Sequence, residues 1–164
     1  MSAPNCQHGC ARYAEMRYLM DHSNLPDSRK TPQILTAPKC DFAAYKHLAE
    51  IKSDILDFVT NGDDLYICGA NTGNGKTSWA IKLMLAYFDK VWAGNGLRQR
   101  ALYIPVSWFL LKCKEFKKTD LKFEELKEQL LEVDLVVWDD IGSTYLSDYD
   151  YTNLLMYIDH RKTN

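Results

Sequence analysis

The residues with the clearest chemical potential form a short glycine-rich stretch at 73–77, with the sequence Gly-Asn-Gly-Lys-Thr. An apolar run at 65–68 precedes it, and apolar residues at helical spacing follow from 78 to 88. A strand, a glycine-rich turn and a helix in this order present free N–H groups and the positive end of the helix dipole to an anion. The order therefore predicts a phosphate-binding loop.

Two side chains of this loop have separate expected roles. Lys76 places a positive charge near the β- and γ-phosphates and is a candidate catalytic residue, and the Thr77 hydroxyl is placed to ligate Mg²⁺. The usual pattern has glycine where this chain has Ala70, with Gly69 one place early. Because alanine disfavours a positive φ, the first turn of the loop is expected to be slightly altered. The residues expected to hold the nucleotide are Ala70, Asn71, Thr72, Gly73, Asn74, Gly75, Lys76, Thr77 and Ser78.

A second apolar run, at 135–138, ends in the acids Asp139 and Asp140. Such a run is typical of a buried parallel strand, and ligands of open α/β sheets bind at the carboxyl ends of the strands. Asp139 is expected to hold the Mg²⁺ of a bound nucleotide, usually through water, and Asp140 to polarise an attacking water as a catalytic residue. With the upstream loop, the acids predict a site for ATP or GTP with Mg²⁺.

The elements that position these residues alternate between strands and helices, which predicts an α/β fold with a parallel sheet and right-handed crossovers. In the helix after the second strand, Trp108, Leu111 and Phe116 are expected to face inward. Expected helices are 11–20, 41–58 (begun by Asp41 and stopped by Asn61-Gly62), 78–89, 107–118, 122–132 and a last one capped by Ser147. Expected strands are 65–69, 101–106 and 135–139.

The 164 residues, 46% hydrophobic and 26% charged with net charge −2, fit one globular domain with a substantial core. No apolar stretch is long enough for a membrane span, and the N-terminus lacks a signal pattern, which predicts a cytoplasmic protein without a membrane partner. Five cysteines in that compartment are expected to be thiols or metal ligands, and Cys68 and Cys113 to be buried.

The run 65–77, the later Trp-Asp-Asp-Ile-Gly at 138–142 and the helix ending in His160-Arg161 resemble the DnaC/DnaI-type helicase loaders, which are AAA+ ATPases of bacterial and phage replication. The resemblance covers roughly residues 41–164. It implies an AAA+ P-loop NTPase core at 40–164, preceded by a short helical N-terminal segment at 1–39. The prolines at 26, 32 and 38 make residues 24–39 of that segment a linker.

The resemblance also implies a function: an ATP-controlled protein that engages a hexameric, DnaB-type replicative helicase and single-stranded DNA. Asp140 stands where most AAA+ proteins have glutamate, although loaders of this family also use aspartate, so slow hydrolysis is expected. Family members continue past a helix like 151–162 into a fourth strand with a polar sensor residue, and then to an arginine finger. The core is therefore expected to be partial, truncated before the fourth core strand. We favour a fragment of a longer product over elements supplied by a partner, and expect self-association.

Two alternatives to a helicase-loading ATPase remain open. The same fold could bind nucleotide without hydrolysis and act as an interaction module, either a switch or a decoy for the helicase. It could also be a transposition-helper ATPase of the same broad family.

Three further patterns have two interpretations each. Cys6, His8 and Cys10, with His22 or Cys40, could bind zinc, but the spacing is incomplete and a metal-free tail is favoured. The methionine-rich stripe at 13–20 is either core or a helix that docks on the helicase, and we lean toward docking. A group of lysines follows two aromatic residues and either contacts single-stranded DNA or forms a solvated helix face. It consists of Trp108 and Phe109 with Lys112, Lys114, Lys117 and Lys118.

Overall fold

The computed structural model describes residues 11–30, 41–69, 73–91, 97–115, 120–142 and 145–162. They form a mixed helix and strand structure, which confirms the α/β class at this level. The elements are α1 (Ala11–Asp21), the 3-10 helix η1 (Asp27–Arg29), α2 (Phe42–Ser53), α3 (Ile55–Thr60), α4 (Lys76–Lys90), β1 (Ala101–Pro105), α5 (Val106–Glu115), α6 (Leu121–Glu132), β2 (Leu135–Asp139) and α7 (Asp148–Lys162).

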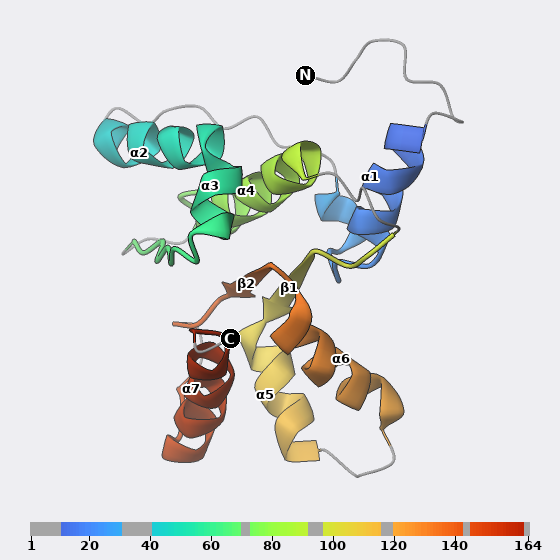
Figure 1. Ribbon diagram of the computed structural model, residues 1–164. Helices are drawn as coiled ribbons and strands as arrows, with labels where there is room; N and C mark the ends of the chain where they lie inside the picture. Colours follow the sequence, from blue (N-terminus) through green and yellow to red (C-terminus); the bar gives the residue numbers. More distant parts are fainter. Residues whose placement is uncertain are drawn as a thin grey trace.

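The strands β1 and β2 lie side by side and run parallel, as expected from the alternation of elements. Their register pairs Ala101 with Leu135 at one end and Pro105 with Asp139 at the other. Helix α4, with α1 to α3 packed around it, lies on one face of this pair, and α5 to α7 lie on the other face (Figure 1). Covered faces on both sides explain why the two strand sequences are almost continuously apolar.

The alternation of side chains along the strands divides the core into two clusters. Ala101 and Tyr103 of β1 belong to the cluster around α4, and Leu102 and Ile104 belong to the cluster with α5 and α6. In β2, Leu135 and Val137 pack on the α4 side, and Val136 and Trp138 pack on the opposite side. Asp139, two residues beyond Val137, is therefore directed to the face that α4 covers.

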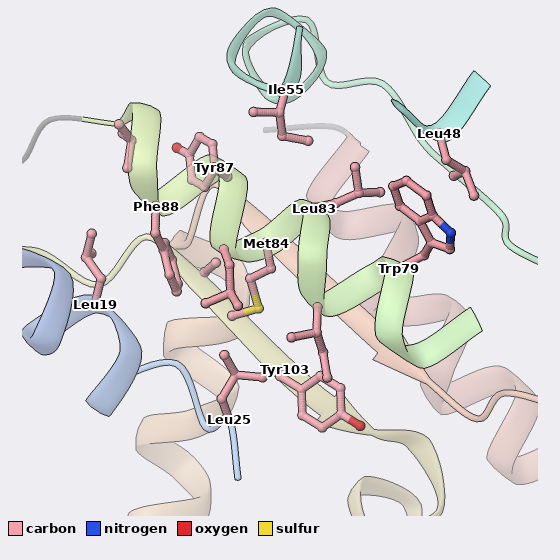
Figure 2. Close-up of a cluster of buried hydrophobic side chains, with 14 residues drawn as sticks. Leu19, Leu25, Leu48, Ile55, Trp79, Leu83, Met84, Tyr87, Phe88 and Tyr103 are labelled. Carbon is pink, nitrogen blue, oxygen red and sulfur yellow. The ribbon is translucent and has the colours of Figure 1, made fainter. Parts of the chain in front are cut away.

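Helix α4 is the centre of the first cluster (Figure 2). Met84 and Phe88 are completely buried in it, because α2, α3 and α1 cover α4 on the sides away from the sheet. Helix α1 also reaches the end of α4, where the Arg12 guanidinium donates to the Phe88 carbonyl at 3.1 Å. Leu19 of α1 is only 2% exposed. The stripe at 13–20 thus contributes to the core of this chain, which favours the first of its two interpretations.

The turn after α1 lies along the outer edge of β1. The Tyr103 N–H donates to the Ser23 carbonyl at 2.8 Å, and Leu25 is buried in the α4 cluster. The beginning of the expected linker at 24–39 is therefore packed against the sheet. Its part at 31–39 lies outside the described residues.

The prediction of a first strand at 65–69 is wrong, because within the described residues only β1 and β2 form a sheet. Leu65 and Ile67 pack against the α4 cluster while Tyr66 is 73% exposed, so the side chains still alternate. Alternation makes a segment suitable for a sheet, but a strand also needs a hydrogen-bonded neighbour. Cys68, expected to be buried, is exposed in this segment, and Cys113 is half-buried.

Two helices differ from their sequence patterns. The expected helix at 41–58 is divided into α2 and α3 at Asp54, where φ is −110° and ψ is 26°. Aspartate is a poor helix former in a helix interior, and the break turns Ile55 into the core, where it is 1% exposed. The expected stop is confirmed: Gly62 has φ of +73° and its N–H donates to the Val59 carbonyl at 3.1 Å.

Helix α5 faces the sheet with different residues from those expected. Phe109 and Leu110 are buried, whereas Trp108 is 38% and Leu111 is 52% exposed. The helix begins directly after β1 at the buried Val106, and this start fixes which face turns inward. Phe116 lies outside the described residues.

Ser147 caps α7 as expected. Its Oγ accepts from the Asp150 N–H at 3.3 Å, and the Asp150 carboxylate accepts in return from the Ser147 N–H at 3.2 Å, which is a capping box. Lys114 of α5 donates to the same carboxylate at 2.8 Å. The hydrogen bonds from Lys114 and Ser147 hold the pKa of Asp150 below its ordinary value.

Replacing Asp150 with asparagine is expected to destabilise the protein at neutral pH more than the substitution Ser147→Ala does. Ser147→Ala removes the helix cap, and such a loss typically costs about 1 kcal/mol. The pKa of Asp150 is lowered in the folded state. The stabilisation by its ionised carboxylate is therefore present above the ordinary aspartate pKa of about 4 and is lost as the pH falls through the folded-state pKa. Urea unfolding of the wild type and Asp150→Asn from pH 7 to pH 2 should therefore show a difference that shrinks below about pH 4. A constant difference, or an equal loss in the exposed Asp159→Asn control, would contradict this role.

Candidate functional site

The glycine-rich loop ends in left-handed backbone at the start of α4. Gly73 has φ of +81° and Gly75, the residue that precedes the helix, has φ of +87°. Glycine adopts this conformation without the strain that a side chain would add. Lys76, Thr77 and Ser78 form the first turn of α4, whose leading N–H groups have no intrahelical acceptor. Among the expected site residues, Ala70, Asn71 and Thr72 lie outside the described residues.

The Lys76 side chain folds back over this loop. Its ammonium group donates to Asn74 Oδ1 at 2.8 Å and to the Gly69 carbonyl at 3.4 Å. The amide of Asn74 also lies close to Gly69, since a Cβ built on Gly69 would come within 2.6 Å of Asn74 Nδ2. The loop thus holds one positive charge at the N-terminus of α4, where the helix dipole adds to it.

The loop and the end of β2 meet through a hydrogen bond between Thr77 and Asp139. The Thr77 hydroxyl lies 2.9 Å from Asp139 Oδ1 and 3.2 Å from Oδ2, although the two residues are 62 positions apart in the sequence. Both side chains are half-buried. The two residues expected to share a metal ion are therefore adjacent.

A third residue, Tyr103, completes this group and was not foreseen from the sequence. Its hydroxyl donates to Asp139 Oδ2 at 2.5 Å, and the residue is only 6% exposed. Burial, followed by the hydrogen bond to Asp139, raises the pKa of the Tyr103 phenol above its ordinary value. The sequence places Tyr103 in the other expected strand, but it does not give the register between the strands. Only the register shows that Tyr103 and Asp139 lie on the same face of the sheet.

Asp140 follows Asp139 directly and has unusual backbone geometry. Its φ of +60° lies in the left-handed region, which few residues other than glycine, asparagine and aspartate adopt readily. The residue is exposed at the end of β2. Non-glycine residues held in this region are frequent at functional sites.

The oxygen atoms at the centre of the site fit Mg²⁺. A hydroxyl and a carboxylate lie side by side at Thr77 and Asp139, and both are ligand types that Mg²⁺ prefers. A Mg²⁺ bound with a nucleotide keeps several waters and takes further oxygens from the phosphates, so two protein side chains are sufficient. When bound, the metal would neutralise phosphate charge, and Thr77 and Asp139 would hold it at the loop.

The candidate zinc site is not described as a whole, because Cys6, His8, Cys10 and Cys40 lie outside the described residues. His22 is described and stacks on Tyr18, with 3.9 Å between the ring centroids. In the part of the chain that the structure describes, no three His, Cys, Asp or Glu residues are grouped as metal ligands would be.

The candidate DNA-contact residues have varied surroundings. Phe109 is fully buried between other aromatic rings and is not available to stack on a base. The charge of Lys114 is paired with Asp150, while Trp108 remains partly exposed beside Lys112 on α5. Lys117 and Lys118 lie outside the described residues. The buried position of Phe109 excludes this residue from the expected DNA contact. For the other residues, the contact stays a prediction.

Comparison with protein-family models, with curated proteins and with solved structures found no match to this chain. Within the described ranges, no helix has the length and apolar character that crossing a membrane requires.

Proposed function

We propose that this protein binds ATP with Mg²⁺ through a P-loop NTPase core of the AAA+ type, and that it serves DNA replication as a helicase loader. The observation that supports the nucleotide site best is the hydrogen bond between Thr77 Oγ1 and Asp139 Oδ1, at 2.9 Å. The sequence assigned both residues to one Mg²⁺ on the basis of two separate motifs. The structure brings the two side chains within hydrogen-bond distance of each other.

The surrounding geometry supports the same proposal. The N-terminus of α4 offers N–H donors and a positive dipole end, and the Lys76 ammonium stays beside them. An anion with several acceptor oxygens, such as a triphosphate, satisfies all of these donors at once. In this arrangement the loop and Lys76 bind phosphate oxygens, while Thr77 and Asp139 face the metal position.

Replacing Thr77 with valine is expected to remove most of the Mg²⁺-dependent part of nucleotide binding. Valine keeps the shape and β-branching of threonine but has no hydroxyl to ligate the metal or to meet Asp139. Titration of a fluorescent ATP analogue should show tighter binding with Mg²⁺ than with EDTA in the wild type, and a difference reduced roughly 10-fold or more in the variant.

Thr60→Val provides a matched control, because Thr60 is also helical and its hydroxyl only donates to the Leu56 carbonyl on the exposed side of α3. This variant should bind like the wild type. A wild-type protein that binds the analogue equally well with Mg²⁺ and with EDTA would refute the proposed metal-nucleotide site.

The choice of partner rests on the resemblance of the motifs to DnaC/DnaI-type loaders. A hexameric replicative helicase is the first candidate and single-stranded DNA is the second. Co-purification with the helicase, tested in the presence of ATP and of ADP, separates a loader from a transposition helper, which would retain a transposase instead.

One observation supports the alternative of a nucleotide-binding switch without hydrolysis. Asp140, the residue assigned to the attacking water, is exposed rather than enclosed. A site that excludes water strengthens electrostatic catalysis, so an open carboxylate favours slow turnover or none. This alternative keeps the same binding residues and differs only in the fate of ATP.

A further inference from the structure

We infer that Tyr103 is a positioning residue for Mg²⁺ binding, because its phenol fixes the carboxylate of Asp139. The inference rests on the proposed function, since it assigns a role within that metal-nucleotide site. None of the sequence motifs includes Tyr103, which lies in the middle of β1.

The geometry distinguishes the two oxygens of the Asp139 carboxylate. Tyr103 donates to Oδ2 at 2.5 Å, whereas the closer contact of the Thr77 hydroxyl is with Oδ1 at 2.9 Å. Two donors on different oxygens define the plane of the carboxylate and prevent its rotation about χ2. Asp139 would then present its carboxylate in one fixed orientation, beside the Thr77 hydroxyl, to a bound metal ion.

Tyr103 is itself held rigidly. Its backbone N–H donates to the Ser23 carbonyl at 2.8 Å on one edge of β1, while β2 pairs with the other edge. Its ring packs beneath α4 in the cluster that also contains Leu25 (Figure 2). A hydrogen-bond donor that is fixed in this way can orient the acceptor, here the Asp139 carboxylate. A mobile donor would instead adjust its own position to that of the acceptor.

A simpler interpretation is that a buried tyrosine only needs some acceptor for its hydroxyl. Tyr87 provides the comparison within the same cluster. It is 3% exposed, and its hydroxyl donates to Asp134 Oδ2 at 2.8 Å, but Asp134 is paired with Arg98 and Arg100 at the opposite end of β2 from Asp139. The two tyrosines thus make the same kind of bond, and only Tyr103 makes it to a candidate metal ligand.

The test compares Tyr103→Phe with Tyr87→Phe in the intact chain. Both variants keep the ring and remove one hydroxyl, so both are expected to lower the unfolding temperature by a few degrees. Binding of a fluorescent ATP analogue is then titrated with Mg²⁺. Tyr103→Phe should require roughly 10-fold more Mg²⁺ for half-maximal binding, which is the usual size of the effect when a partner of a metal ligand is removed. Tyr87→Phe should match the wild type, and affinity in EDTA should be unchanged in both.

A double-mutant cycle shows whether Tyr103 acts through Asp139. If it does, Tyr103→Phe should add little to the Mg²⁺ requirement of Asp139→Asn. A Tyr103→Phe variant with the wild-type Mg²⁺ requirement, or additive effects in the double variant, would overturn the inference while the proposed function stands. Wild-type binding without any Mg²⁺ dependence would overturn both.

Discussion

Replacing Lys76 with alanine is expected to abolish measurable nucleotide binding while the fold persists. The ammonium is the positive side chain at the start of α4, held by Asn74 Oδ1 at 2.8 Å, and it is only half-buried. Its removal takes away charge-assisted hydrogen bonds to phosphate but little packing. Each such bond is worth about 1.5–3 kcal/mol, so losing contacts with two phosphates should weaken binding roughly 100-fold or more.

The measurement is a titration with a fluorescent ATP analogue, accompanied by thermal unfolding to show that the variant is folded. Lys82→Ala is the matched control: it removes the same charge from α4, but Lys82 lies over the Trp79 ring at 4.8 Å instead of at the loop. Unchanged affinity in Lys76→Ala, or an equal loss in Lys82→Ala, would remove the central claim about the loop.

The parts of the fold that the sequence predicts well are those determined by burial. The expected strands at 101–106 and 135–139 correspond to β1 and β2 almost to the residue. Helices α4 and α7 begin next to the loop and Ser147, respectively. Continuous apolar strands must be covered on both faces, so the parallel pairing also follows from their composition.

The parts that the sequence does not predict depend on neighbours. The segment 65–69 has the alternation of a strand, yet whether it pairs depends on another segment lying beside it. In α5, Trp108 and Leu111 have the same spacing as core residues. The direction in which the helix leaves β1 turns Phe109 inward instead. Spacing gives the period of a helix, and its rotation about the axis comes from tertiary packing.

The site shows the same division. Loop chemistry indicates Lys76 and Thr77, and the end of an apolar strand indicates Asp139, so each half of the site can be recognised alone. The sequence also places the two halves together, because strand ends and the loop belong on one edge of a parallel sheet. Tyr103 has no motif, and its role depends on the register that aligns it with Val137, one pleat before Asp139.

Replacing Asp140 with asparagine is expected to preserve nucleotide binding and to slow any hydrolysis by roughly 10²–10⁴-fold, the usual effect of removing a positioned base. Asparagine is the appropriate substitution because it tolerates the φ of +60° that Asp140 adopts, whereas alanine would add backbone strain. A changed rate can then be attributed to the lost carboxylate. Thermal unfolding should show no loss of stability.

Phosphate release at saturating ATP, with and without single-stranded DNA, measures this effect. Asp63→Asn removes a comparable exposed carboxylate before the segment 65–69 and should turn over like the wild type. Equal turnover in Asp140→Asn and the wild type would show that another group orients the water. The wild type could also bind Mg-ATP tightly but release no phosphate under either condition. That result would agree with the exposed position of Asp140. The protein would then be a nucleotide-controlled switch that changes partners when it binds ATP rather than when it hydrolyses ATP.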